Sequence, residues 1–326
     1  MTDSPPPPAG FLLHPEAPLH DTGWGHPEHQ GRLRALASAV GRDLLALHEA
    51  VVQVEPGPVT DEDLLRVHTP EHLAMLRAAV AKADQEASTV QLDADTIVSA
   101  ASWGAATGST GALLTATGRV ADGTLAAGFV ATRPPGHHAT SDRAMGFCLI
   151  NHVAVAARWL QATGRAERVL IVDWDVHHGN GTQDIFFADG TVFYLSLHQW
   201  PHYPGSGAVD ETGIDEGADW TLNVPLPAGT SAIAYHEHFS GALRQALDTS
   251  RPDFVLISAG FDVMAGDPLG GMLLEPEDLH ALTREVMAGA GDGVGVVAAL
   301  EGGYDPARTG LGAAAVLRAL AGIDLE

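Results

Sequence analysis

The chain has 326 residues, 45% hydrophobic and 18% charged, which is typical of a globular protein rather than a disordered or fibrous one. Its net charge is −24, with one lysine at Lys82, which argues against nucleic-acid binding because phosphates are neutralised by Lys and Arg. The one cysteine, Cys148, excludes an intramolecular disulfide and a thiolate-rich zinc site, so a metal would need His and carboxylate ligands.

No segment looks like a secretion signal, and no apolar run approaches the roughly 18 residues of a membrane helix. We therefore expect a cytoplasmic protein that makes no contact with a membrane. The acidic charge leaves two interpretations open, namely solubility in salt and attraction of a cationic substrate. The sequence does not decide between a monomer and a homo-oligomer.

Residues 1–10 contain the run Pro5 to Pro8 and are predicted to be a disordered tail, because consecutive prolines fit neither a helix nor a strand. Residues 11–326 are expected to form one domain. Within it, apolar residues at helical spacing predict helices over residues 32–51, 71–83 and 100–114.

The pattern then changes to short apolar runs that end in polar residues. These runs, at 168–174, 192–197, 252–260 and 294–303, are typical of buried parallel strands. Helical patterns at 152–162, 233–247, 276–287 and 311–320 alternate with them. The alternation predicts a single-domain α/β fold with a doubly wound, mostly parallel sheet flanked by helices. Ligands bind such sheets beyond the carboxyl ends of the strands.

The densest group of metal-binding side chains follows the strand predicted at 168–174. It reads Asp173-Trp174-Asp175-Val176-His177-His178-Gly179-Asn180-Gly181. Alternation along an extended chain would place Asp173, Asp175 and His177 on one face, and Asp262, just past the strand predicted at 252–260, could supply a further ligand. Three protein ligands and one open position make a catalytic zinc site. Any one of these acids alone would more simply be a helix cap or turn residue.

Two further motifs carry residues suited to acid-base chemistry. Arg133-Pro134-Pro135-Gly136-His137-His138-Ala139 presents adjacent histidines, which beside a metal suit proton transfer to and from water. In Leu300-Glu301-Gly302-Gly303-Tyr304 the glycines let the backbone approach a ligand and turn a phenol inward. Taken alone, the histidine pair would be polar surface and Tyr304 a packing residue.

Together these motifs resemble the histone deacetylase superfamily, which includes acetylpolyamine amidohydrolases and acetoin-utilisation proteins. The likeness is nearest to class II members and runs from about His20 to Tyr304. Besides the motifs above it includes His26-Pro27-Glu28, Gly146-Phe147-Cys148, Ser196-Leu197-His198 and residues 259–268. The resemblance implies an arginase/deacetylase-like fold and, over residues 11–326, a zinc-dependent deacetylase domain that hydrolyses linear amide bonds.

The resemblance also assigns the ions. Asp175, His177 and Asp262 would bind Zn²⁺, with Fe²⁺ as an alternative in the cell, and Asp173 would not be a zinc ligand. A structural K⁺ or Na⁺ ion would be bound by Asp173, Asp175, His177, Ser196 and Leu197.

The same resemblance implies the catalytic roles. His138 would act as general base on water and later as general acid, and Asp173 would orient His137, which tunes the local field. Tyr304 would donate a hydrogen bond to the carbonyl oxygen as it gains negative charge. Asn180 stands where many class I members have an acid, a class II pattern that should leave His138 less basic.

For the substrate, the resemblance implies a narrow tunnel for an acylated aliphatic amine. Phe147 and Tyr203 would be its walls, Gly146 a backbone contact and Leu269 a rim residue, while Arg32 would serve an internal pocket that receives acetate. A polyamine-selective relative carries glutamate at the position of Leu269. This difference favours acetyl-lysine peptides or small acylated amines, and leaves acetylpolyamines as the alternative.

Two other classes of protein compete with this interpretation. A catalytically silent protein that binds acylated amines is disfavoured because every residue needed for the chemistry is present. A binuclear manganese ureohydrolase is disfavoured because the run Asp-x-Asp-x-His-His lacks the Asp-x-His-x-Asp spacing of those enzymes.

Overall fold

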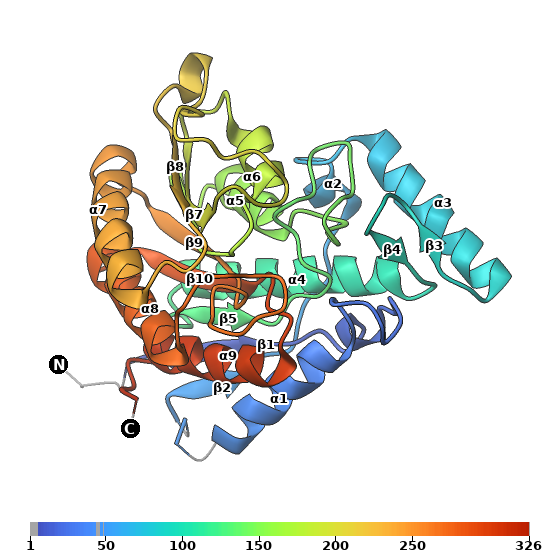
Figure 1. Cartoon of the computed structure of the whole chain (residues 1–326), viewed down its shortest axis with the longest axis horizontal. Coiled ribbons are helices and arrows are strands. Elements are labelled where there is room, and N and C mark those ends of the chain that lie inside the picture. The colour runs from blue at the N-terminus through green and yellow to red at the C-terminus, as the bar shows by residue number, and fades with distance from the viewer. Residues whose placement is uncertain (1–5, 44–45, 48, 326) are drawn as a thin grey trace.

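The computed structural model describes residues 6–43, 46–47 and 49–325. An eight-stranded sheet in the order β2-β1-β5-β10-β9-β6-β7-β8 forms its centre, and every neighbouring pair is parallel (Figure 1). The strands are β1 (Ala9–Leu12), β2 (Val51–Gln53), β5 (Gly128–Val130), β6 (Val169–Asp173), β7 (Val192–Gln199), β8 (Thr221–Leu226), β9 (Phe254–Ala259) and β10 (Gly295–Leu300). A separate antiparallel pair joins β3 (Val90–Gln91) to β4 (Ile97–Val98).

Helices cover both faces of the sheet. They are α1 (Gly31–Asp43), α2 (Asp61–Leu64), α3 (Pro70–Glu86), α4 (Ser102–Ala121), α5 (His152–Ala162), α6 (Asn180–Phe186), α7 (Ala232–Ser250), α8 (Pro276–Ala290) and α9 (Pro306–Leu320). Among the described residues, no helix is long and apolar enough to cross a membrane.

Alternate residues of the central strands pack into two separate cores. In β6, Leu170 and Val172 belong to the core formed with α1, α7, α8 and α9, whereas Val169 and Ile171 belong to the core formed with α3, α4 and α5. A strand covered on both faces needs apolar residues at every position, which explains the continuous apolar runs. The predicted single-domain, doubly wound α/β fold is confirmed.

The structure corrects the predictions at the amino-terminal side of the sheet. The helix expected over 32–51 ends at Asp43, and Val51 begins β2 instead. Residues 1–5 of the predicted tail lie outside the described residues, and Ala9 and Gly10 belong to β1 because they pair in parallel with Val51 and Val52. Residues 44–45 and 48, in the predicted helix, also lie outside the described part.

Strands β10, β9, β6 and β7 are parallel neighbours, so their carboxyl ends lie side by side at one edge of the sheet. From β6 the chain proceeds outward to β7 and β8, and then returns to β9 on the other side of β6 before continuing to β10. The direction of winding therefore changes between β6 and β9. Such a change in strand order opens a crevice where ligands bind in α/β sheets.

Leu256 tests how strongly this centre depends on close packing. It is 0% exposed and lies in register with Ile171 and Val297 on the two neighbouring strands. We expect Leu256→Ala to lower the free energy of unfolding by about 2–5 kcal/mol, because it leaves a cavity. The same change at Leu311, 52% exposed on α9, should cost about 0.5 kcal/mol or less. Urea denaturation of both variants measures the difference, and equal losses would contradict the assigned core.

Candidate active site

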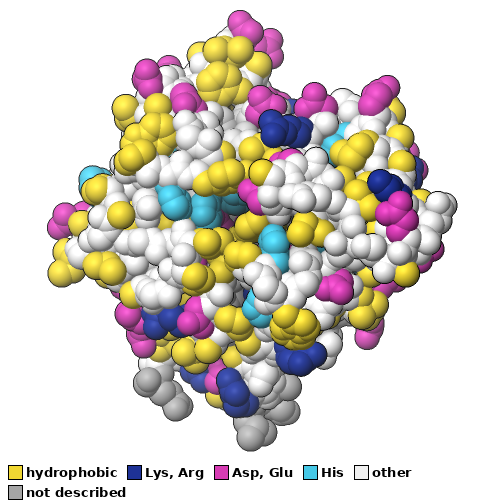
Figure 2. Space-filling model, turned by 45° about the vertical axis from the view of Figure 1, so that its right-hand side comes forward, with side chains coloured by type: hydrophobic (Ala, Val, Ile, Leu, Met, Phe, Trp, Pro, Cys, Tyr) yellow, Lys and Arg dark blue, Asp and Glu magenta, His cyan; other side chains and the backbone are white. Residues whose placement is uncertain are grey.

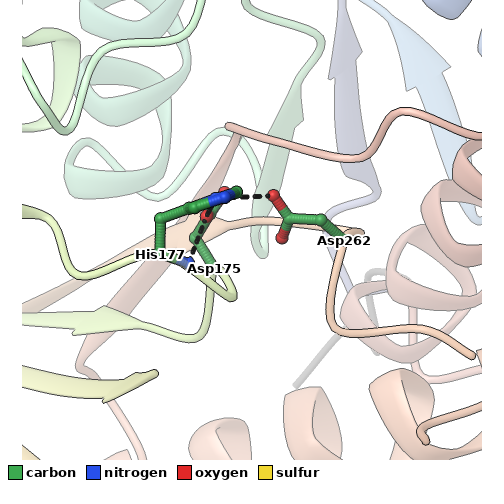
Figure 3. A group of neighbouring side chains, drawn as sticks. All are labelled: Asp175, His177 and Asp262. Atoms are coloured by element: carbon green, nitrogen blue, oxygen red, sulfur yellow. Dashed lines mark hydrogen bonds and ion pairs between the residues drawn. The ribbon is translucent and has the colours of Figure 1, made fainter. Parts of the chain in front are cut away.

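Three buried side chains meet where β6 and β9 end, at the switch in strand order. Asp175 and His177 follow β6, and Asp262 follows β9. Their ligand atoms lie within 4.8 Å of one another. Nδ1 of His177 points between the carboxylates, 3.0 Å from Oδ1 of Asp175 and 3.2 Å from Oδ2 of Asp262 (Figure 3). The structure thus brings together the three predicted metal ligands.

Hydrogen bonds to the backbone hold this geometry. Strand β6 ends at Asp173, so the predicted alternation along an extended chain stops there and does not account for the convergence. Instead, the N–H of Asp175 donates to Oδ1 of Asp173, and the N–H of His177 donates to Oδ1 of Asp175. Across the switch, the N–H of Val176 donates to Oδ1 of Asp262 at 2.9 Å.

The charges at this point fit a metal ion. Burial and the negative charge of Asp175 raise the pKa of Asp262 to about 7, although the neighbouring His177 opposes the rise. Burial alone would lower the pKa of His177, but its contacts with the two carboxylates raise it to about 9. The hydrogen bond of Nδ1 of His177 goes to Asp175, so the buried Oδ2 of Asp262 has His177 as an ion-pair neighbour at 3.2 Å but accepts no hydrogen bond from the described residues. A divalent cation among these atoms would relieve the repulsion between the carboxylates and bind Oδ2 of Asp262.

Close approach of the backbone requires glycine at position 302. The N–H of Gly302 donates to Oδ2 of Asp175 at 2.7 Å. A Cβ atom at this position would lie only 2.0 Å from Oδ2 of Asp262. A larger residue would therefore push the carboxylates out of place.

The two predicted histidines lie beside this group with different charges. Burial would lower the pKa of His137, but Asp175 and Asp173 outweigh it and raise the pKa to about 10. For His138, burial and the neighbouring His137 and His177 lower the pKa well below its usual value. His137 Nδ1 lies 3.0 Å from Oδ2 of Asp173, as predicted. His137 is therefore protonated at neutral pH, and His138 is neutral.

The tautomer of His138 follows from Asn180. Nδ1 of His138 lies 2.8 Å from Oδ1 of Asn180, and an amide oxygen only accepts hydrogen bonds. Nδ1 therefore carries the proton, which leaves Nε2 of His138 as a free base.

A cavity of about 300 Å³ opens onto this group. Figure 2 shows a hollow near the centre of one face, with several histidine side chains around it. The cavity is lined by Asp95, His138, Gly146, Phe147, His177, His202, Tyr203, Pro268, Leu269 and Tyr304. All four residues predicted to contact the substrate are in this set.

Tyr304 lies inside this cavity wall with Arg32 behind it. The Tyr304 ring is 5.7 Å from that of Phe147, and burial raises the phenol pKa well above its usual value, so the hydroxyl stays protonated. No hydrogen bond from it to any described residue is present. Arg32 is fully buried, with its Cζ 4.9 Å from the centre of the Tyr304 ring. It is not among the cavity-lining residues, and its predicted role toward acetate stays a prediction.

Of the residues predicted to bind a monovalent cation, Asp175 and His177 are also in the metal group, and the other three lie on the neighbouring strands β6 and β7. Ser196 of β7 lies in register with Asp173 of β6, and Leu197 follows it. The hydroxyl of Ser196 contacts Nδ1 of His198 at 2.9 Å. The ion itself stays a prediction.

Four buried or half-buried residues at the site were not predicted to have a role. Glu301 accepts hydrogen bonds through Oε2 from the N–H groups of Gly136 and His137. The hydroxyl of Tyr194 donates to Oδ2 of Asp173, and Asp95 and His202 line the cavity. The acidic segment Asp93-Ala94-Asp95 could have indicated a role for Asp95 from the sequence alone. Tyr194 lies within an apolar run, and nothing in that run indicates a role for its hydroxyl.

Comparison with known proteins now decides the family. A model of the histone deacetylase domain matches residues 26–320. The chain belongs to the histone deacetylase family. It is 34% identical over 324 residues to a probable deacetylase of Archaeoglobus fulgidus, across 97% of this chain and 87% of that protein.

A plant relative and a solved structure agree with this membership. Histone deacetylase 15 of Arabidopsis thaliana is 38% identical over 333 residues, which cover 97% of this deacetylase-family chain and 56% of the plant protein. The crystal structure of an HDA15 HD domain superposes with a TM-score of 0.90 at 35% identity, and the match covers 97% of this chain and 89% of that one. The family and its deacetylase members support a hydrolase that acts on amides.

Loss of Asp262 tests whether the three ligands of this deacetylase-family site bind metal. We expect Asp262→Ala to lose nearly all bound metal, because only two of the three ligands remain and the site loses one negative charge. Elemental analysis of the purified proteins measures the metal per chain, and circular dichroism checks folding. Asp248→Ala, the same change at an exposed residue of α7, should retain the metal. A fully occupied site in a folded Asp262→Ala variant would remove Asp262 from the ligand set.

Proposed function

We propose that this protein is a zinc-dependent amidohydrolase that removes acetyl or other short acyl groups from lysine side chains of peptides or from small acylated amines. The observation that carries the proposal is the Asp175, His177 and Asp262 group at the base of an apolar-walled cavity. Zn²⁺, or Fe²⁺ in its place, would polarise the amide carbonyl and lower the pKa of water when bound there.

The histidine pair provides the proton transfers. Nε2 of neutral His138 accepts a proton from the attacking water and later donates it to the leaving amine. Asn180 keeps the required tautomer by its 2.8 Å contact with Nδ1. His137 lies beside His138 with Nδ1 3.0 Å from Oδ2 of Asp173, a carboxylate that favours the protonated form of His137 and so positive charge beside the reacting carbonyl.

Tyr304 supplies a hydrogen bond where negative charge develops. Its phenol is protonated because burial raises the pKa, and it has no partner among the described residues that would compete for the proton. It can therefore donate to the carbonyl oxygen in the transition state. Donors of this kind stabilise the developing oxyanion more than the neutral carbonyl.

The cavity walls suit a linear acylated amine. Phe147 and Tyr203 would be walls for a methylene chain, and Gly146 and Leu269 line the same cavity. The uncharged Leu269 favours acetyl-lysine peptides or small acylated amines. The same proposal includes an acetate product beside Arg32 and a K⁺ or Na⁺ ion bound by Asp173, Asp175, His177, Ser196 and Leu197.

An acetylpolyamine is the second candidate substrate, and two observations favour it. Asp95, which is half-buried, lines the same cavity. A carboxylate there would attract the second cationic group of a polyamine. The net charge of −24 acts in the same direction.

Tyr304→Phe tests the role of the phenol. We expect kcat to fall by about 10²–10³-fold, because one oxyanion donor is lost, with the zinc content unchanged. Tyr203→Phe removes a hydroxyl from a more exposed wall of the same cavity, 37% exposed, and should change kcat far less. Steady-state kinetics and elemental analysis measure both quantities. Near-normal turnover in Tyr304→Phe would refute the role.

A comparison of substrates tests the function. The zinc-loaded protein is expected to show its highest kcat/KM on an acetyl-lysine peptide, measured beside acetylated polyamines and longer acyl-lysine peptides under the same conditions. A higher value on an acetylated polyamine would establish the second candidate. No turnover of any of these amides, or two manganese ions per chain, would contradict the proposed function.

A further inference from the structure

A buried carboxylate lies behind the active site and is not part of it. Glu28 precedes α1 and is 0% exposed. Its Oε1 accepts hydrogen bonds from two guanidinium groups, Nη1 of Arg32 at 2.9 Å and Nε of Arg133 at 2.7 Å. All three side chains are fully buried. One carboxylate therefore binds two arginines, Arg32 and Arg133, that lie 101 residues apart in the sequence.

Arg32 carries this contact to the loop of Tyr304. Its Nε donates to the carbonyl oxygen of Gly303, and its Nη2 donates to that of Glu301. These carbonyls flank Gly302, and the guanidinium also lies against the Tyr304 ring. Arg32 is thus one of the groups that hold the loop of the phenol, together with Asp267, whose Oδ2 accepts a hydrogen bond from the N–H of Tyr304.

Arg133 carries the contact to the loop of the two histidines. It begins the motif that ends in His137 and His138. Its Nη1 donates to the carbonyl of His20 at 2.6 Å, and its Nη2 donates to that of Glu28 at 3.0 Å. The hydroxyl of Ser109 holds the backbone of Arg133 at both its N–H and its carbonyl.

Charge makes this arrangement depend on Glu28. Burial would raise the pKa of Glu28, but Arg133 and Arg32 outweigh it and lower the pKa, so the group is an anion. The neighbouring His20 is neutral, because burial lowers its pKa to about 4. Two buried guanidinium groups without a counter-ion would repel each other and be costly to keep out of water.

We propose that Glu28 is a positioning residue for the deacetylation reaction, which holds Arg32 and Arg133 so that Tyr304 and the two histidines keep their relative position. This inference rests on the proposed function. A purely electrostatic role would act in the opposite direction. Loss of a negative charge would make the region behind Tyr304 more positive, and this would favour the oxyanion.

Glu28→Gln and Glu28→Asp, each made in the natural protein and in Tyr304→Phe, test the inference. In the natural protein we expect Glu28→Gln to lower kcat about tenfold or more, because small misplacements of catalytic groups are costly. KM and zinc content should stay the same. Glu28→Asp keeps the charge and should restore most of kcat. In the Tyr304→Phe background the fold-loss from Glu28→Gln should be smaller, because the part of the effect that acts through Tyr304 is already lost and only the part that acts through the histidines remains.

The control is Glu62→Gln, which removes an equivalent pairing on the surface. Glu62 is 81% exposed and pairs with Arg66 four residues later, so kcat should be unchanged. Equal fold-losses from Glu28→Gln in both Tyr304 backgrounds, or a kcat that is unchanged or raised, would overturn the inference. If Glu28→Gln does not fold, Arg32→Lys is compared in the two backgrounds by the same criterion, because lysine keeps the charge beside Glu28 but cannot reproduce the bonds of Arg32 to the carbonyls of Gly303 and Glu301.

Hydrogen exchange separates this inference from the proposed function. Amides of residues 301–305 should exchange faster in Glu28→Gln than in the natural protein and in Glu62→Gln. This measurement needs no substrate. If the zinc-loaded natural protein hydrolyses none of the acylated amines, the proposed function fails, and unchanged exchange in residues 301–305 would separately refute the positioning role of Glu28.

Discussion

Burial of negative charge at one edge of the sheet is the constraint on which the rest of the site depends. Asp173, Asp175, Asp262 and Glu301 are all 0% exposed, and they end or follow the neighbouring strands β6, β9 and β10. An uncompensated buried carboxylate costs several kcal/mol. The loops at this edge must therefore supply hydrogen-bond donors and positive charge, and two of the residues that do so, His137 and His177, also belong to the proposed chemistry.

Compensation is unequal among these carboxylates. Both oxygens of Asp173 and of Asp175 accept hydrogen bonds, in part from backbone N–H groups. Both oxygens of Glu301 do so as well. Asp262 differs, because only its Oδ1 accepts a hydrogen bond from the described residues, and its Oδ2 has only the ion-pair contact with His177 at 3.2 Å. The oxygen that lacks a hydrogen-bond donor lies where the three ligand atoms converge. A cation would therefore compensate the buried negative charge at this point rather than elsewhere along the edge.

Burial also explains which strands could be predicted. Strands β6, β7, β9 and β10 are covered on both faces, so each is a continuous apolar run that stands out in the sequence. Strands β1, β2 and β5 have 4, 3 and 3 residues, which is too short to show any period. Strand β8 is at the edge of the sheet and includes Pro225, a residue that edge strands tolerate but that lowers any prediction of a strand. The positions of β1, β2, β5 and β8 are therefore determined by pairing with neighbouring strands in the folded protein and not by a local sequence pattern.

The site divides in the same way. Side chains that act from one short motif, such as Asp175 with His177 or His137 with His138, could be predicted because both members stand in the same motif, although the hydrogen bonds that hold Asp175 and His177 in place could not. Glu28 and Arg32 are four residues apart, a spacing that on a helix indicates an ordinary surface ion pair. Only the packed structure shows that both are buried and that Arg133 shares the same carboxylate. A buried charge needs an opposite charge or hydrogen-bond donors beside it, and the fold can bring these from distant parts of the sequence. The residues that hold the catalytic side chains in place therefore come from different motifs, and one motif alone does not reveal them.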